Sequence, residues 1–240
     1  MPLESLQRQS WALDFVQADK SGQGVGGFVR LELRPDLGAA WYWAYLVGPE
    51  VGLIVVRDHE ATLPRPTASP VVRAEGLWAE FVCETDGEHW SVGLEAFGVR
   101  LDDPADGFRG EIGERLAVGL DLEWEIDEHG GAVYGEILLG RHRLAFDGVG
   151  WFTHEPGEHS WATTAGIEAS FDADGLPRSV TARVRGEAEA VEILGVTAIP
   201  IDGSQSGAGA GSPRLVRVLG RWTHDDGATK VGWIDLVEWR

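Results

Sequence analysis

The sequence predicts an all-β protein made of two antiparallel domains packed together, each a barrel or a sandwich. Apolar and polar residues alternate along many short runs, which is the pattern of strands that bury one face. Turn signals such as Asp86-Gly87 and Asp172–Gly175 separate these runs. No amphipathic pattern is long enough for a helix of more than about three turns. Together these observations favour strands joined by tight turns.

Alternation defines the strands of the first half in order. A Gly-rich turn separates the first two runs, and Pro35–Gly38 ends the second. Three prolines make 59–75 an irregular connection, and acidic, Gly-containing 102–113 reads as a loop. The predicted strands cover residues 11–18, 26–34, 41–47, 52–58, 77–85, 89–101 and 116–126.

Two of these strands carry informative faces. In 41–47 both faces are apolar, so we expect this strand to be covered on both sides. In 116–126 the apolar residues share one parity and are expected to face inward. Asp121, Glu123 and Glu125 share the other parity, and we interpret them as a solvated face rather than a metal site.

The sharp turn at 127–131 is the candidate domain boundary. It divides the chain into an N-terminal β domain, residues 1–127, and a C-terminal β domain, residues 128–240. The Gly/Ser-rich segment 203–212 reads as a flexible loop, since it lacks the Lys-Ser/Thr of a phosphate-binding loop. Strands of the second half are expected over 132–147 (with a turn at Gly140), 162–170, 179–190, 191–201, 214–223 and 229–240.

Composition excludes several classes of function. The net charge of −19 argues against nucleic acid and anionic membrane surfaces as partners. No apolar run approaches the roughly 20 residues of a membrane span, and the first residues lack the apolar core of a signal peptide. The single cysteine, Cys83, rules out an internal disulfide and fits a reducing compartment. We therefore expect a cytoplasmic protein without membrane insertion.

Tryptophan is the outlier of the composition, with 11 residues against 3 tyrosines. Large flat rings line apolar ligand sites, so this surplus predicts an aromatic-lined cavity, although any single ring can equally be ordinary core. The candidate substrate-binding residues are Trp41, Trp43, Tyr45, Trp78, Trp90, Trp151, Trp161 and Trp233.

The stretch 147–161 is the first place to look for chemistry. It interrupts the alternating pattern with two glycines, two histidines and the turn signal Pro156-Gly157, and we expect a strand, a bulged bend and a return strand near Ser160. His154 and His159 are candidate general acid and base, because histidine titrates near neutral pH. Their offset of five residues puts them on opposite faces of a regular strand, so they converge only if the bend brings them together. The alternative is a pair of ordinary loop histidines.

Glu84 is the third catalytic candidate. With Glu80 it shares a strand face with Trp78, and a carboxyl beside apolar rings keeps its proton and can donate it to an alkene or a carbonyl. The alternative is a solvent-facing edge. No set of residues has metal-ligand spacing, and hydrolase and dinucleotide motifs are absent, so we expect no metal and no cofactor.

Residues 147–161 resemble a lipocalin-like family that includes acyclic carotenoid hydratases, AttH-like proteins, tocopherol cyclases and lipocalin-like Diels–Alderases. The family pattern runs Asp-Gly-x-Gly-x-Arg-Asp-His-Ser-Trp-Gly-x-Arg-x-Trp. Phe152, Thr153, Glu155-Pro156 and His159 depart from it, which removes both arginines and the second aspartate of the pattern. Segments 41–43, 76–80 and 232–239 also look similar to the family. The matching positions are Asp147, Gly148, Gly150, His154, Gly157 and Trp161.

The resemblance implies two lipocalin-like barrels with an apolar ligand site, and the hydration, cyclisation or isomerisation of polyene, terpenoid or polyketide substrates. Our first hypothesis is thus a cofactor-free cyclase or isomerase of secondary metabolism that holds its substrate in a reactive fold, pericyclic cyclisation included. Hydratase-like chemistry belongs to the same hypothesis. The alternatives are a non-catalytic carrier of small hydrophobic molecules and a structural or interaction β module.

Overall fold

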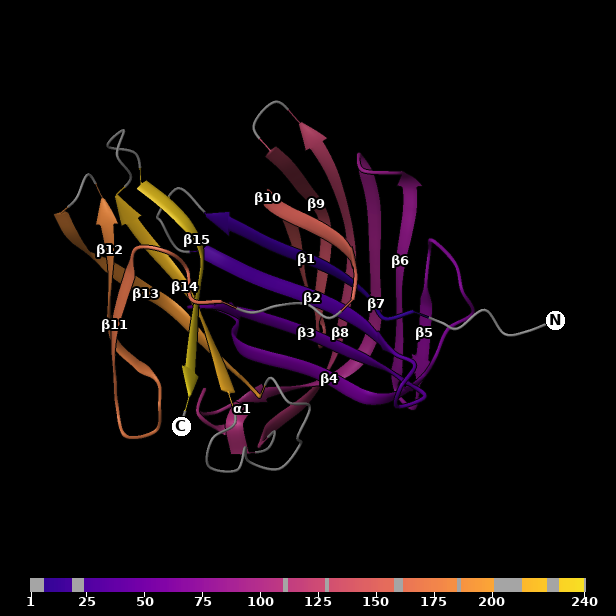
Figure 1. Cartoon of the computed structure of the whole chain (residues 1–240), viewed down its shortest axis with the longest axis horizontal. Coiled ribbons are helices and arrows are strands. Elements are labelled where there is room, and N and C mark those ends of the chain that lie inside the picture. The colour runs from indigo at the N-terminus through magenta and orange to yellow at the C-terminus, as the bar shows by residue number, and fades with distance from the viewer. Residues whose placement is uncertain are drawn as a thin grey trace.

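The structure is almost entirely antiparallel β-sheet, as the alternating pattern predicts (Figure 1). The computed structural model describes residues 7–18, 24–109, 112–127, 130–157, 162–184, 187–200, 213–223 and 229–239. The first sheet contains β1 (Gln9–Ala18), β2 (Gly24–Arg34), β3 (Ala39–Gly48), β4 (Gly52–Thr62), β5 (Val71–Ala74), β6 (Leu77–Thr85), β7 (His89–Leu101), β8 (Gly113–Asp127), β9 (Gly130–Leu139) and β10 (His142–Pro156). The second contains β11 (Ile167–Phe171), β12 (Pro177–Val184), β13 (Glu187–Pro200), β14 (Pro213–Thr223) and β15 (Thr229–Trp239), and one short helix, α1 (Asp106–Arg109), follows β7.

The first sheet closes into a barrel. β10 pairs with β1, and β4 pairs with β7 from Leu53↔Leu101 to Val55↔Val99, so that β1–β4 and β7–β10 form a ring. The earlier part of β7 pairs with β6 instead, which continues the sheet to β5. A closed antiparallel barrel agrees with the lipocalin-like resemblance for this part of the chain.

The second sheet is an open meander in the order β11-β12-β13-β14-β15. It lies to the left of the barrel in Figure 1 and packs on the outer face of β1–β4. The described residues thus form a barrel joined face to face with a sheet. The all-β fold class is confirmed, and no pairing among the described residues closes the second sheet.

Two apolar layers follow from strand alternation. Inward residues of the barrel fill its interior, with Trp11, Leu13 and Phe15 at 0% exposure on β1 alone. Outward residues of β1–β4 pack against β13–β15. β3 contributes to both layers, with Tyr42 inward and Trp43 outward, which confirms that this strand is covered on both sides.

The strand pairing corrects the predicted domain division. The boundary between residues 127 and 128 falls between β8 and β9, which form one hairpin of the barrel from Val118↔Leu139 to Asp127↔Gly130. The change of sheet comes later, between β10 and β11. The turn chemistry of a hairpin and of a domain linker is the same, so the local signal does not distinguish them.

β10 runs from His142 to Pro156 with no register shift, so no bulge interrupts it, and it ends at the predicted bend, where Gly157 has a φ of +104°. Gly148 and Gly150 allow the backbone of β1 to lie close to β10. A Cβ at Gly150 would lie 2.6 Å from the carbonyl oxygen of Asp14. The return strand predicted near Ser160 lies partly outside the described residues, and β11 begins only at Ile167. Smaller differences are the short strand β5 in the proline-rich connection and α1 in the predicted loop.

Candidate functional site

The structure separates the predicted catalytic residues. His154 lies on the inward face of β10, opposite Trp11 of β1. Glu84 is exposed near the end of β6, where it accepts a hydrogen bond from Ser91 Oγ at 3.4 Å, as its solvent-facing alternative expected. His159 lies outside the described residues. No pair of predicted acid and base is therefore brought together within the described chain.

His154 occupies an aromatic end of the barrel. Its ring stacks on Trp11, with the ring centroids 4.6 Å apart, and meets Trp90 edge-on at 6.0 Å. Burial lowers the pKa of the His154 imidazole below its ordinary value, and the nearby charge of Asp86 opposes this only in part. The ring is thus predominantly neutral at pH 7 and can accept a proton. Phe152 completes this cluster by stacking on Trp90 at 4.4 Å.

The predicted aromatic cavity residues do not surround one space. Trp90 faces the barrel interior, at 2% exposure. Trp41, Trp43 and Tyr45 lie on the other face of the barrel wall, buried beneath the second sheet. Trp41 and Trp43 contact the buried ring of His59 there, at centroid distances of 4.8 and 5.0 Å. They share an apolar layer with Ile199, Leu215 and Leu219, so they belong to the packing between the sheets.

The other predicted rings are spread further. Trp151 is 55% exposed on the outer face of β10, and Trp78 lies half-buried on the outer face of β6. Trp233 reaches from β15 to the barrel, where its indole nitrogen donates to the carbonyl oxygens of Phe15 and Gly27 at 3.3 and 3.2 Å. Trp161 lies outside the described residues.

A cavity opens at the end of the barrel away from His154. One hollow of about 150 Å³ and another of about 490 Å³ share Val25, Glu50 and Leu144, so they form one site, which we call the barrel mouth. His142 and Leu144 begin β10, whereas His154 lies twelve residues later, up to about 40 Å away along an extended strand. The remaining lining residues are Gln17, Gly24, Pro49, Val51, Gly52, Arg100, Ile137, Leu139, His142, Ala145 and Phe146.

Barrel closure explains the chemistry of the mouth. Val25, Ile137 and Phe146 are inward residues of three strands and give an apolar wall. Leu144 has the same inward parity but is 36% exposed, because the barrel is open here. Three ionisable residues, Glu50, Arg100 and His142, line the wider hollow. An apolar wall with few polar groups is the usual composition of a small-molecule site, and barrel mouths are common places for one.

Sequence reasoning missed the barrel mouth. Glu50 belongs to the β3–β4 turn, Arg100 to the end of β7, and His142 to the start of β10. They come together only through the β4–β7 and β1–β10 pairings. The one local signal was Leu144, an apolar residue of inward parity just after the turn at Gly140.

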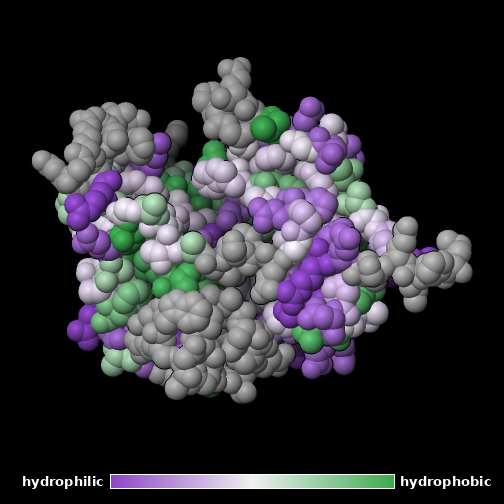
Figure 2. Space-filling model, in the orientation of Figure 1, coloured by the Kyte–Doolittle hydropathy of each residue, from purple (hydrophilic) through white to green (hydrophobic). Residues whose placement is uncertain are grey.

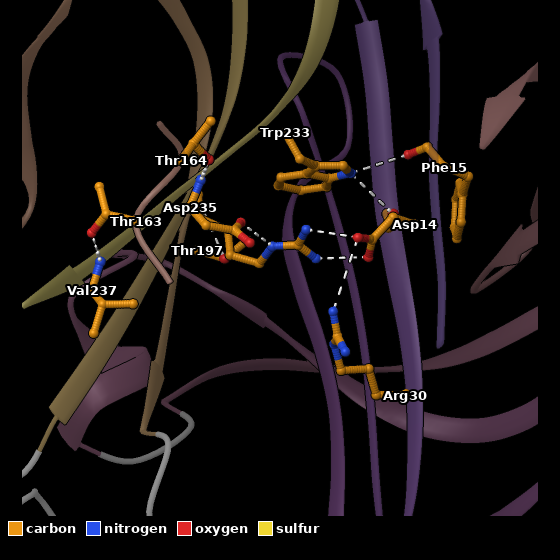
Figure 3. Close-up of polar contacts among 11 residues, drawn as sticks. Asp14, Phe15, Arg30, Thr163, Thr164, Thr197, Trp233, Asp235 and Val237 are labelled. Atoms are coloured by element: carbon orange, nitrogen blue, oxygen red, sulfur yellow. Dashed lines mark hydrogen bonds and ion pairs between the residues drawn. The ribbon is translucent and has the colours of Figure 1, made fainter. Parts of the chain in front are cut away.

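A second unpredicted feature is an ion cluster between the sheets (Figure 3). Arg217 of β14 is 2% exposed and donates from Nη1 and Nη2 to Asp14 at 2.8 and 2.9 Å and from Nε to Asp235 at 2.7 Å. Its guanidinium also lies over the rings of Phe28 and Trp233, at 4.5 and 4.9 Å. Because its guanidinium donates to carboxylates on both sheets, Arg217 links β14 to the barrel.

Burial and the neighbouring carboxylates shift the pKa values of Arg217 and Arg30 in opposite directions. For Arg217, burial disfavours the charged form, but Asp14 and Asp235 outweigh it and raise the pKa. For Arg30, whose Nη2 lies 3.9 Å from Asp14, burial dominates and lowers the pKa to about 10. Both remain charged at neutral pH. Among the described residues, no group of three or more His, Cys, Asp or Glu side chains is placed to hold a metal ion.

No helix in the described part of the chain combines the length and apolar character needed to cross a bilayer. In the view of Figure 2, apolar and hydrophilic residues are interspersed, with apolar residues visible over the second sheet beside the barrel.

Comparison with known proteins gives a family and a distant structure. A family model described as a domain of unknown function (DUF7064) matches residues 2–163, which contain the whole barrel. No curated protein matches the chain. A solved structure from Nitrosomonas europaea, described provisionally as an AttH protein, has 12% sequence identity and a TM-score of 0.35 over 97% of this chain and 92% of that chain.

Proposed function

Because the chain belongs to the DUF7064 family, whose function is unknown, we propose from its own structure that the barrel mouth binds a small, largely apolar molecule with one polar group. The observation that carries this proposal is the hollow of about 490 Å³, which combines an apolar wall with Glu50, Arg100 and His142. Pockets of about 300–1,000 Å³ with this composition hold small organic ligands. A binding site of this kind is all that the hypothesis of a non-catalytic carrier needs.

The bound molecule is expected to be neutral overall. Arg100 is already engaged with Glu114, from Nη1 to Oε2 at 2.9 Å, so its charge is largely compensated. Glu50 adds a negative charge to the wall, and the protein as a whole carries −19. These charges disfavour an anionic ligand. An alcohol, aldehyde or ketone with a hydrocarbon body fits the wall and offers one group for hydrogen bonding.

An enzyme acting at the barrel mouth would depend on Glu50 and His142. Glu50 and His142 are two proton-transfer groups on the wall of one cavity, which is the minimum for general acid–base isomerisation or cyclisation. His154, the catalytic candidate of the sequence, lies at the aromatic end and is not part of this wall. A cyclase or isomerase working at the mouth would therefore use Glu50 or His142.

The test is ligand-observed NMR with geraniol, citral and decanol, followed by mass spectrometry of each mixture. Leu144→Glu places a charge on the apolar wall and is expected to weaken binding by about tenfold or more. Leu37→Glu is the matched control, since Leu37 is also an exposed leucine but lies in the β2–β3 turn. A ligand that binds and is recovered unchanged supports a carrier. A product that disappears in Glu50→Gln or His142→Gln supports the enzyme. No binding across the panel, or equal loss in both leucine variants, overturns the proposal.

A further inference from the structure

The barrel wall has one covered side and one open side. The second sheet packs on the outer face of β1–β4 and on the end of β7 at Val99 and Leu101. The rest of the outer face of β6–β9 has no described element packed on it. On that open face, strand pairing aligns Glu80, Gly93, Asp121 and Glu136 in one row across the four strands. The next row contains Trp78, Glu95, Gly119 and Leu138.

Two glycines make this face a groove. Gly93 and Gly119 present no side chain, and both line a hollow of about 380 Å³. Gly119 also lines a second hollow of about 490 Å³. The two hollows share Trp78, Glu95, Gly119 and Leu138, so the groove is continuous. A Cβ at Gly93 would lie 3.1 Å from both Trp78 and Glu80, which shows how closely these two side chains flank the glycine. The groove continues to Phe97, which is 57% exposed.

The groove carries uncompensated negative charge. Among the described residues, Glu80, Glu95 and Asp121 have no ion-pair partner, whereas Glu136 is paired with Arg143 at 2.6 Å. Asp121 also lies directly opposite Glu136, and like charges in this position destabilise a sheet. Arg143 lines the same hollow and already offsets the charge of Glu136, so the groove keeps an excess of negative charge from Glu80, Glu95 and Asp121. A positive group from outside the chain would reduce this excess. Trp78 offers such a group a ring face as well.

We propose that this groove docks a basic segment of a partner protein. A lysine or arginine side chain lies against Trp78 among Glu80, Glu95 and Asp121, and an apolar side chain of the same segment contacts Leu138. Phe97 is not part of this contact, because the guanidinium of Arg115 already lies over its ring at 4.8 Å. The length of the groove, over four strands, suits an extended segment better than a small amine. A second copy of this chain is disfavoured, because each copy carries −19. This site is separate from the barrel mouth, with no lining residue in common.

The test measures fluorescence anisotropy of a labelled peptide that alternates lysine and leucine, at low and at high salt. We expect binding that weakens with salt, and none for a peptide that alternates glutamate and leucine. The triple variant Glu80→Gln/Glu95→Gln/Asp121→Asn is expected to weaken binding by about tenfold or more. The matched control is Glu60→Gln/Glu88→Gln/Asp102→Asn, which removes as many exposed carboxylates outside the groove and is expected to change affinity by less than about twofold.

Three outcomes contradict the proposal. Equal weakening by the two triple variants would show that net charge alone attracts the peptide. Complete displacement of the peptide by spermine at equal amine concentration would assign the groove to small cations instead of a protein segment. Trp78→Ala gives a further check, since it is expected to lower affinity without changing the salt dependence, and no effect of this variant also contradicts the proposed contact.

Discussion

Arg217 donates two parallel hydrogen bonds to Asp14, at 2.8 and 2.9 Å, between strands that lie 203 residues apart in the sequence. The bond joins β14 of the second sheet to β1 of the barrel, and Asp235 of β15 accepts from the same guanidinium. A bidentate pair of this kind fixes both distance and orientation. It therefore sets how the second sheet sits on the barrel wall.

Loss of Arg217 is expected to destabilise the protein strongly. Arg217→Met leaves Asp14 and Asp235 beside Arg30 without their main partner, and breaking a buried pair costs about 3–5 kcal/mol. The free energy of unfolding from urea denaturation measures this. The control is Arg183→Met, which breaks an exposed pair with Glu168 and is expected to cost less than about 1 kcal/mol. Similar losses in both variants would contradict a special role for Arg217.

His154 is expected to titrate below 6.5, the ordinary value for histidine, because burial lowers its pKa. Between the lowered value and 6.5 the unfolded chain binds more protons at this residue than the folded chain does. The contribution of His154 to the free energy of unfolding is thus fully present above pH 6.5 and is lost as the pH falls through the folded-state pKa. NMR of the imidazole protons gives the midpoint. His154 is already partly exposed, and Trp11→Leu exposes its ring further and should move the midpoint upward. A wild-type midpoint above 6.5 would refute the assignment.

Tyr42 is expected to tolerate removal of its hydroxyl. The side chain is fully buried in the barrel and its oxygen has no hydrogen-bond partner among the described residues. An unsatisfied buried hydroxyl costs free energy, so Tyr42→Phe should leave the free energy of unfolding unchanged or raise it by about 1 kcal/mol. Burial also raises the pKa of this phenol, so alkaline absorbance titration should show it ionising only on unfolding. A clear loss of stability in Tyr42→Phe would reveal a partner, such as a buried water.

Gly150 is expected to reject a side chain. A Cβ there would lie 2.6 Å from both the Asp14 carbonyl oxygen and a methyl carbon of Val133, which belong to the two strands that pair with β10. Gly150→Ala should lower the free energy of unfolding by about 1–3 kcal/mol, by overpacking. Gly119→Ala is a milder control, since its nearest neighbour would be Leu138 Cβ at 3.2 Å. Equal effects in the two variants would mean that the 2.6 Å contacts at Gly150 do not decide the cost.

Much of the secondary structure could be predicted because it depends on local chemistry. Alternation located most of the strands and assigned the two faces of 41–47, and Asp86-Gly87 marked the turn between β6 and β7. The strand predicted over 179–190 is wrong, because β12 ends at Val184 and pairs with β13, which begins at Glu187. The inward series of 116–126 is confirmed at Val118, Leu120, Leu122 and Trp124, which are buried. It fails at Ile126, which is 56% exposed because β8 extends here past the covered part of the barrel.

The candidate site followed from the sequence only in part. His154 and Trp90 do lie together at the aromatic end, but Trp41, Trp43 and Trp233 lie between the sheets and Trp151 faces solvent. Parity states which residues share a face of one strand. It does not state whether that face becomes the barrel interior, the packing layer or the surface.

The sequence by itself determined the strands, most of their turns and the alternation of their faces, because these depend on side chains a few residues apart. The tertiary structure decided the closure through β4–β7, the barrel mouth around Glu50 and His142, and the tie from Arg217 to Asp14. Each of these depends on pairings between strands distant in sequence, whose register is set by the packing of the whole apolar interior. Local pattern therefore specified the elements, and the global balance of burial specified which of them meet.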